Sequence, residues 1–418
     1  MRYDVAIIGG GPAGMMAAGR AGELGAHVIL LEKNSALGVK LLITGHGRCN
    51  ITNKTDEPKD MARKYGQRHE QSGKFLLPLL YRFGVRDVID FFESRGVRTK
   101  VEKGNRVLCE SDRAEDVLGA LIKYLNDSQV EVKLNAEVKE VVRKRNLIEK
   151  IVLASREEII ADKFIVCTGG KSYPATGSTG DGYGWAALFG HKVVTPSPSL
   201  TPVVLKEGFV KELEGLSLKD AFVSLYKDGK KIDSGQGDAI FTANGMSGPA
   251  IINMSRSIGK ALPGKVALKI DLVPDLEFTS LDIMLRNCFQ EGANRLFKNS
   301  LDKFVPQKLV PIIAKVSGVD PGKKSGLVTR EERKRLAHLL KEFSLEVKGL
   351  AGFDKAVITS GGIELSEIEP KTMRSKLVEN LYFAGEILDL DGPTGGYNLQ
   401  VCWSTGYAAG QAASGKAL

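Results

Sequence analysis

Three glycines near the start of the chain have the spacing of a phosphate-binding turn. Gly9, Gly11 and Gly14 form G-x-G-x-x-G directly after the apolar run 5–8. In such a turn the first glycine makes the bend, the second lets the backbone approach a pyrophosphate, and the third lets helix and strand pack closely. The free N–H groups at the start of the following helix attract the phosphates. The motif therefore predicts a bound dinucleotide.

An acid after the second apolar run indicates which dinucleotide binds. Residues 28–31 form this run, and Glu32 follows it, 18 residues beyond Gly14. An acid near this position takes the hydroxyls of a ribose. It repels the additional phosphate of NADP, which needs an arginine instead. We therefore expect FAD or NAD here; a tight turn in an ordinary α/β unit is the alternative.

Three further glycine-rich loops carry polar side chains. Residues 38–53 show neither helical nor strand periodicity and contain Gly-His-Gly-Arg-Cys-Asn. Residues 168–184 follow the apolar strand 163–167, and residues 385–396 precede a helix of small residues. Glycine lets a backbone pass close to a ligand, and loops inside compact domains usually serve function. The alternatives are a purely structural loop for residues 38–53, a plain crossover for residues 168–184, and a closely packed core helix after residues 385–396.

The segments around these loops predict an α/β fold. Strand, glycine turn, helix and strand follow one another in residues 5–31. Near the end, a strand at 380–384 leads into a helix that reaches about residue 414, which is a second anion-favouring helix start. We also expect a small antiparallel unit, formed by strands at 130–134, 137–142, 148–153 and 158–166.

A change in composition marks a domain boundary. Three prolines fall between residues 195 and 202. We predict a discontinuous nucleotide-binding domain, 1–193 plus 346–418, because both pieces carry cofactor loops. An inserted substrate domain, 194–345, interrupts it, rich in strands at first and helical later. The active site is expected in the cleft between the inserted domain and the cofactor.

Composition sets the outer bounds of the prediction. With 418 residues, 43% hydrophobic and 26% charged, the chain is typical of a globular protein of two or three domains. It enters its first strand at once, and no apolar run approaches the ~18 residues of a membrane helix. We expect a soluble, cytoplasmic protein without membrane contact. Five scattered cysteines without C-x-x-C, and five scattered histidines, predict neither a redox disulfide nor a metal site.

The chain is basic, with a net charge of +9 and a pI near 9.1. Residues 194–345 contain 23 Lys and Arg against 17 Asp and Glu, so most of the excess falls in the inserted domain. One interpretation is a solvated helix face, because Glu331 and Glu332 alternate with basic residues. The other is attraction of an anionic ligand or RNA. Nucleic acid is thus not excluded as a partner, and the oligomeric state is left open.

Four motifs together resemble the bacterial BaiN/YhiN-type NAD(P)/FAD-dependent oxidoreductases, the HI0933-like flavoproteins, nearly from end to end. They are the first glycine turn; Gly45-x-Gly47-Arg48-Cys49-Asn50-x-Thr52-Asn53; Thr168-Gly169-Gly170 with Thr179-Gly180-Asp181-Gly182; and Phe383-Ala384-Gly385-Glu386 with Gly395-Gly396-Tyr397-Asn398-Leu399-Gln400. The second is the most specific. It also contains a departure, because His46 stands where members often have a glycine.

The resemblance implies a Rossmann-like, glutathione-reductase-type FAD fold with an inserted cap and non-covalent FAD. Glu32 would bind the adenosine ribose, Gly385-Glu386 would lie at the ribityl chain, and residues 395–398 would lie at the pyrimidine edge of the flavin. A helix start there suits the negative charge of the reduced flavin. The expected cofactor-binding residues are Gly9, Gly11, Pro12, Ala13, Gly14, Glu32, Lys33, Lys40, Gly47, Arg48, Cys49, Asn50, Thr168, Gly169, Gly170, Gly180, Asp181, Gly385, Glu386, Gly396, Tyr397 and Asn398; the catalytic candidates are His46, Arg48, Cys49 and Asn50.

Three functions follow as hypotheses. The first is reduction of a small organic substrate with electrons from NAD(P)H, by way of the flavin. One subgroup of the family resembles enoyl reductases of steroid-like ketones, but the substrate itself does not transfer. The second is an oxidase of an amine or alcohol that uses oxygen. The third is a flavoprotein of RNA modification, motivated by the basic inserted domain.

Overall fold

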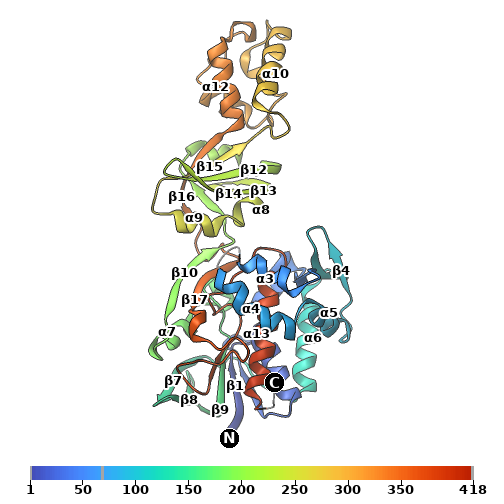
Figure 1. The fold of residues 1–418 in the computed structure, drawn as a ribbon, viewed down its shortest axis with the longest axis vertical. Coiled ribbons are helices and arrows are strands. Elements are labelled where there is room, and N and C mark those ends of the chain that lie inside the picture. The colour runs from blue at the N-terminus through green and yellow to red at the C-terminus, as the bar shows by residue number, and fades with distance from the viewer. Residues whose placement is uncertain (1, 67–69, 416–418) are drawn as a thin grey trace. The chain divides into compact units, whose positions relative to one another are not determined.

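The computed structural model describes residues 2–66 and 70–415, and Figure 1 shows their course. The chain divides into two compact units, residues 1–197 with 357–418 and residues 198–356. Each has its own apolar core. The expected boundary between 345 and 346 would cut a strand of the second unit, and the division instead follows residue 356. Met1, residues 67–69 and residues 416–418, which the sequence assigns to the nucleotide-binding domain, lie outside the described residues.

A mixed sheet of seven strands forms the centre of the first unit. Five strands run parallel, in the order β6 (Glu131–Lys133), β2 (Val28–Leu31), β1 (Arg2–Ile8), β9 (Glu158–Val166) and β18 (Leu381–Phe383). β8 (Leu147–Leu153) and β7 (Val138–Lys144) extend it as an antiparallel hairpin from the start of β9. The sequence prediction placed β6 in that antiparallel unit. It pairs in parallel with β2 because the helix α6 (Ala114–Asp127) precedes it as a crossover.

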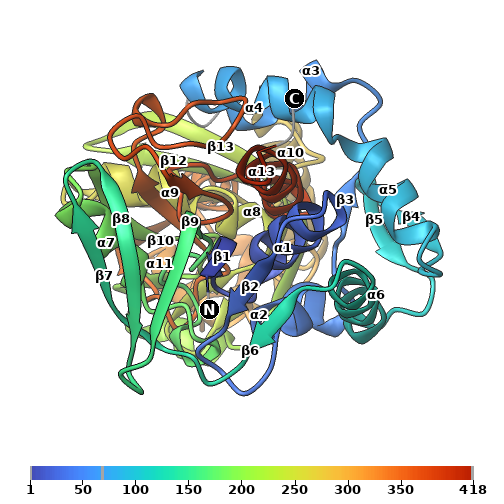
Figure 2. The same cartoon turned by 90° about the horizontal axis from the view of Figure 1, so that it is seen from below.

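Two helices from opposite ends of the chain lie side by side against this sheet, α1 (Pro12–Glu23) and α13 (Tyr397–Ala413) (Figure 2). Glycine permits this close approach. A Cβ on Gly406 would lie 2.5 Å from the carbonyl oxygen of Ala13, and one on Gly410 would lie 2.2 Å from that of Ala17. The remaining elements of the first unit are α2 (Val39–Ile43), β3 (Thr52–Asn53), α3 (Pro58–Gly66), α4 (Glu70–Arg82), α5 (Val85–Glu93), β4 (Thr99–Glu102), β5 (Arg106–Cys109), α7 (Asp181–Leu188), β10 (Val193–Ser199) and β17 (Ile358–Ile363).

The second unit is a closed antiparallel barrel that carries helices. Around the barrel the strands are β11 (Val203–Leu205), β14 (Gly245–Ser247), β13 (Lys230–Thr242), β12 (Ser217–Lys227), β15 (Val266–Asp271) and β16 (Phe343–Leu350). The helices are α8 (Pro249–Ile252), α9 (Ser255–Ala261), α10 (Phe278–Glu291), α11 (Val310–Val316) and α12 (Arg330–Lys341). The predicted α/β fold with an inserted unit of strands and helices is confirmed. However, β16 follows the helices and closes the barrel against β11.

Over the described ranges, 2–66 and 70–415, we find no helix with both the length and the apolar character that crossing a membrane requires.

Candidate cofactor-binding site

A cavity of about 820 Å³, counting the part open to solvent, lies in the first unit where β1, β2 and β9 end. Ligands of open α/β sheets bind at this carboxyl edge. The cavity brings together eleven of the expected cofactor residues, which are Gly9, Gly11, Pro12, Ala13, Glu32, Lys33, Lys40, Thr168, Gly169, Asp181 and Glu386. All four predicted loops thus contribute to one place, although the loop 38–53 does so only at its start, with Lys40 among the expected residues.

The glycine turn is shaped for a ligand at one position and for the protein at two others. A Cβ on Gly14 would lie 1.8 Å from the carbonyl oxygen of Gly9, and one on Gly9 would lie 2.6 Å from that of Cys167. A Cβ on Gly11 would have no contact within 4 Å among the residues that the structure describes, its chain neighbours aside. Helix α1 starts here without a side-chain cap and without an acid in its first turn. Its first N–H groups and its positive dipole end are therefore open to a phosphate.

Glu32 joins the turn to the loop after β2. Its side chain is buried, with Oε2 accepting a hydrogen bond from the Gly10 N–H at 2.7 Å and Oε1 accepting one from the Asn34 N–H at 2.8 Å. A carboxylate has about four acceptor sites, so both oxygens keep capacity for ribose hydroxyls.

Two lysines hold the other loops of the cavity in place. Lys33 Nζ donates to Thr179 Oγ1 at 2.6 Å and pairs with Asp181 Oδ2 at 2.8 Å. Lys40 Nζ pairs with Glu386 Oε2 at 2.7 Å. The other oxygen of Glu386 accepts from the Thr359 N–H at 2.7 Å. The Glu386 carboxylate is thereby fixed at the cavity wall.

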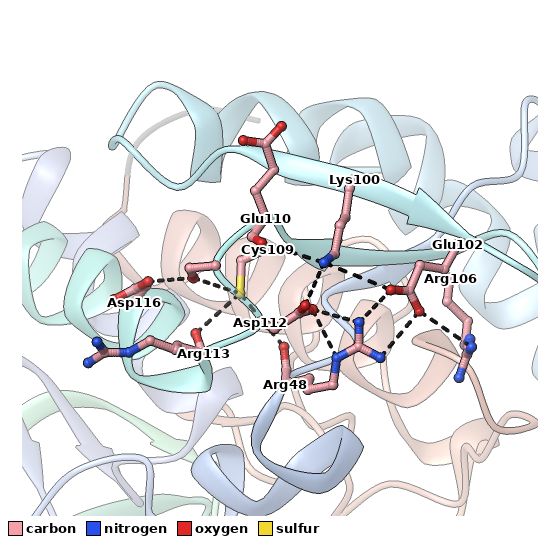
Figure 3. A network of polar contacts seen from close by, with 10 residues as sticks. Arg48, Lys100, Glu102, Arg106, Cys109, Glu110, Asp112, Arg113 and Asp116 are labelled. Atoms are coloured by element: carbon pink, nitrogen blue, oxygen red, sulfur yellow. Dashed lines mark hydrogen bonds and ion pairs between the residues drawn. The ribbon is translucent and has the colours of Figure 1, made fainter.

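The Gly-Arg-Cys-Asn segment does not line the cavity. Its residues follow α2, a one-turn helix that the lack of periodicity did not predict. Arg48 binds Glu102 and Asp112 (Figure 3). Cys49 is fully buried, and burial raises the pKa of its thiol to about 12, so that the thiol stays neutral. Two of the four catalytic candidates keep polar atoms for a ligand. His46 is exposed, and the buried Oδ1 of Asn50 has no hydrogen-bond partner among the described residues.

The start of α13 interlocks with the end of that same segment. Thr52 Oγ1 donates to Gln400 Oε1 at 2.6 Å, and Tyr397 donates to Asn53 Oδ1 at 3.1 Å. A Cβ on Gly396 would lie 2.2 Å from the carbonyl oxygen of Thr52. Expected cofactor residues that do not line the cavity are Gly14, Gly47, Arg48, Cys49, Asn50, Gly170, Gly180, Gly385, Gly396, Tyr397 and Asn398. For them, cofactor contact stays a prediction.

The cavity also has walls that sequence reasoning missed, namely Ile8, Leu31, Asn34, Val39, Ala136, Val138, Cys167, Thr176, Gly177, Ser178, Trp185 and Cys402. Ile8, Leu31 and Cys167 lie at the ends of neighbouring parallel strands, a signal that the strand pattern contained. Trp185 and Cys402 come from helices and gave no such signal.

The residues present fit FAD. The open space at Gly11 and the uncapped start of α1 suit a pyrophosphate, and the buried Glu32 suits a ribose. Thr168 lines the cavity, and its buried hydroxyl has no hydrogen-bond partner in the described part of the chain. Buried polar groups nearly always have a hydrogen-bond partner, so we expect this hydroxyl to bond a ligand or water.

A family model described as HI0933-like protein Rossmann domain matches residues 3–412. The chain belongs to this family. The family resemblance noted from the motifs is thereby confirmed. The protein is an FAD-dependent oxidoreductase of this family.

Two curated relatives of this family member extend over nearly its whole length. The 3-dehydro-bile acid delta(4,6)-reductase of Clostridium scindens is 31% identical over 414 residues, covering 98% of each chain. The ribosomal RNA dihydrouridine synthase of Escherichia coli is 29% identical over 411 residues, again covering 98% of each. Among solved structures, 3-ketosteroid-delta4-(5alpha)-dehydrogenase from Rhodococcus jostii RHA1 is similar, with a TM-score of 0.55, 14% identity and coverage of 99% and 97%. At this identity the likeness shows the fold alone.

Proposed function

We propose that the protein reduces a carbon–carbon double bond conjugated to a carbonyl group, with NAD(P)H as the electron donor. The observation that carries the proposal is a cavity fitted to FAD in a chain whose near-full-length relatives share this chemistry. The name of the bile acid relative describes reduction of a delta(4,6) double-bond system next to a 3-keto group. A dihydrouridine synthase saturates the uracil double bond, which is also conjugated to a carbonyl.

The residues of the cavity divide the work of holding FAD. The first turn of α1 binds the pyrophosphate, with Gly11 giving it room, and Glu32 binds the adenosine ribose. Glu386, held by Lys40, would bind the hydroxyls of the ribityl chain. When bound, FAD supplies the redox chemistry. The uncapped start of α13 favours negative charge, as the reduced flavin needs at its pyrimidine edge.

The electron donor has no dedicated domain in this chain. No second G-x-G-x-x-G stands between a strand and a helix in the sequence. NAD(P)H and the substrate should therefore bind in turn at one place, which predicts ping-pong kinetics and weak nicotinamide binding.

Anaerobic stopped-flow spectroscopy tests the proposal. NADH or NADPH should bleach the flavin absorbance, and a conjugated enone should restore it faster than air does. Steady-state lines should run parallel as donor and enone are varied. Intersecting lines would contradict the binding of NAD(P)H and substrate in turn at one place. Bleaching by an amine or alcohol, with none by NAD(P)H, would favour the oxidase alternative instead.

A specific observation favours RNA as a second candidate substrate. On α12, Glu332 forms its ion pair with Lys323, outside the helix, at 2.8 Å and caps the helix with Thr329. Several cations of the helical part enter no ion pair with any described residue, namely Arg286, Arg295, Lys298, Lys315, Arg330, Lys334 and Arg335. Such a surplus suits phosphates. A uridine in RNA would then supply the conjugated double bond.

Binding of a ribosomal RNA fragment, measured by fluorescence anisotropy against salt, decides this candidate. Replacing Arg330, Lys334 and Arg335 by glutamine should weaken binding and flatten the salt slope by roughly 2, since each phosphate contact contributes about 0.7–0.9. The FAD content of the variant should not change. Equal slopes for variant and wild type would leave only the small-molecule substrate.

A further inference from the structure

We propose that Arg48 is a positioning residue for the FAD site. It holds the segment 44–50 in shape by ion pairs to Glu102 and Asp112. The proposal concerns cofactor binding alone and stands apart from the choice of substrate.

The side chain of Arg48 is fixed by two carboxylates from a different part of the chain. Its Nε donates to Asp112 Oδ1 at 2.9 Å, and its Nη1 donates to Glu102 Oε2 at 3.3 Å; Nη2 bonds both acids. Figure 3 shows the guanidinium between them. Lys100 pairs with Asp112 at 2.6 Å, and Arg106 pairs with Glu102 at 3.5 Å. The two acids thus sit among three cations.

This network differs from an ordinary surface ion pair. A single exposed pair contributes little, whereas a planar guanidinium with several charge-assisted bonds fixes a geometry. The hydrogen bond from Arg48 is the main cause of a lowered pKa at Glu102, and that from Lys100 is the main cause at Asp112, with Arg48 second. Both acids are therefore charged at neutral pH and hold the arginine from two sides.

The segment that Arg48 belongs to has a backbone that needs such support. Four of the five residues 45–49 have a left-handed backbone. The φ angles are 58° at Gly45, 59° at His46, 83° at Gly47 and 55° at Cys49. Residues with a Cβ disfavour this region and adopt it where the surroundings impose it. Within this run, Cys49 is buried and His46 is exposed.

The segment joins two parts of the cofactor site. Before it, Val39 and Lys40 of α2 line the cavity. After it, the Ile51 carbonyl accepts a hydrogen bond from Trp403 Nε1 at 2.8 Å, and Thr52 bonds Gln400 of α13. Between them lies Asn50, whose buried Oδ1 has no hydrogen-bond partner within residues 2–66 and 70–415. Segment 44–50, which joins α2 to the contacts with α13, consists largely of left-handed residues. We infer that the hairpin β4–β5 and the turn after it fix these two parts relative to each other through Arg48.

The experiment compares Arg48→Met, Arg48→Lys and the double variant Glu102→Gln with Asp112→Asn. A matched control is Lys150→Met, which breaks the 2.6 Å ion pair to Glu158 on the β8–β9 hairpin. The side chain of Lys150 is 29% exposed and that of Arg48 is 33% exposed, so the two sites are comparable. Measurements are hydrogen exchange of the amides of residues 44–50 in the apoprotein, the FAD dissociation constant, and the absorption spectrum of bound flavin.

We expect Arg48→Met to raise exchange in this segment and to weaken FAD about tenfold, the loss that follows if the competent shape is populated roughly a tenth of the time. The flavin spectrum should shift, Arg48→Lys should restore part of the affinity, and the control should match the wild type. If Arg48→Met does not fold, the double variant carries the test, since it keeps the arginine and removes its partners. Wild-type exchange and FAD affinity in the folded variant would overturn the proposal.

Discussion

Replacing Gly11 and Gly14 in turn by alanine distinguishes a glycine needed for ligand binding from one needed for the fold. Its backbone has φ −80° and ψ −176°, which alanine adopts without strain. Apart from its chain neighbours, the added Cβ of Gly11→Ala would meet no atom of the described part of the chain within 4 Å. The apoprotein should therefore keep its free energy of unfolding within about 0.5 kcal/mol. At Gly14 the same change places a Cβ 1.8 Å from the Gly9 carbonyl oxygen, so Gly14→Ala should destabilise the fold itself, by about 1–3 kcal/mol or more.

FAD binding should respond in a different way. If the pyrophosphate lies over Gly11, the methyl group of Gly11→Ala overlaps it, and an overpacking cost of about 1–3 kcal/mol weakens FAD roughly 5- to 150-fold. Urea unfolding of the apoprotein and titration with FAD, followed by flavin fluorescence, measure the two quantities in the same preparation. Wild-type FAD affinity in a normally stable Gly11→Ala protein would refute the placement of the cofactor on this turn.

Three further outcomes are expected. Glu32→Ala should weaken FAD by roughly 1–3 kcal/mol, because ribose hydroxyls lose their buried acceptor; in calorimetric titration, an unchanged dissociation constant would mean that Glu32 serves only the Gly10 and Asn34 amides. Stability should fall in acid through His191, which is buried between Glu367 Oε2 at 2.9 Å and Ser375 Oγ at 2.7 Å. Burial lowers the pKa of His191 although its ring is hydrogen-bonded to the Glu367 carboxylate, so the unfolded chain binds the proton more readily. The stabilisation is complete above about pH 6.5 and is lost as pH falls through the folded pKa. Urea unfolding between pH 7.5 and 5 should show a shallower loss for His191→Asn, and an equal loss would contradict this. Finally, thiol counts before and after dithionite should agree, since all five cysteines are free; two additional thiols after reduction would reveal a redox pair.

The sequence predicted those parts of the site whose signals are local. The first glycine turn and the acid after β2 each follow a strand pattern directly and line the cavity; the glycine-fed start of α13 had an equally local signal, and its contact with the cofactor stays a prediction. The partners of Arg48 could not be found in this way, because Glu102 and Asp112 lie 54 and 64 residues along the chain. The closed barrel was missed for the same reason. β11 pairs with β16, more than a hundred residues later, and nothing in either short strand specifies the other.

The packing of α13 on α1 also determines the order in which the protein can be completed during synthesis. All six barrel strands lie between residues 203 and 350, so the second unit has its full set of strands while the last part of the chain is still being translated. The nucleotide-binding unit lacks β18 and α13 at that point, and the surface of α1 that receives Gly406 and Gly410 is uncovered. Domains fold as their residues emerge. Uptake of FAD is therefore expected to be a late event that follows the emergence of α13. A chain cut before residue 397 should retain a barrel but bind no flavin.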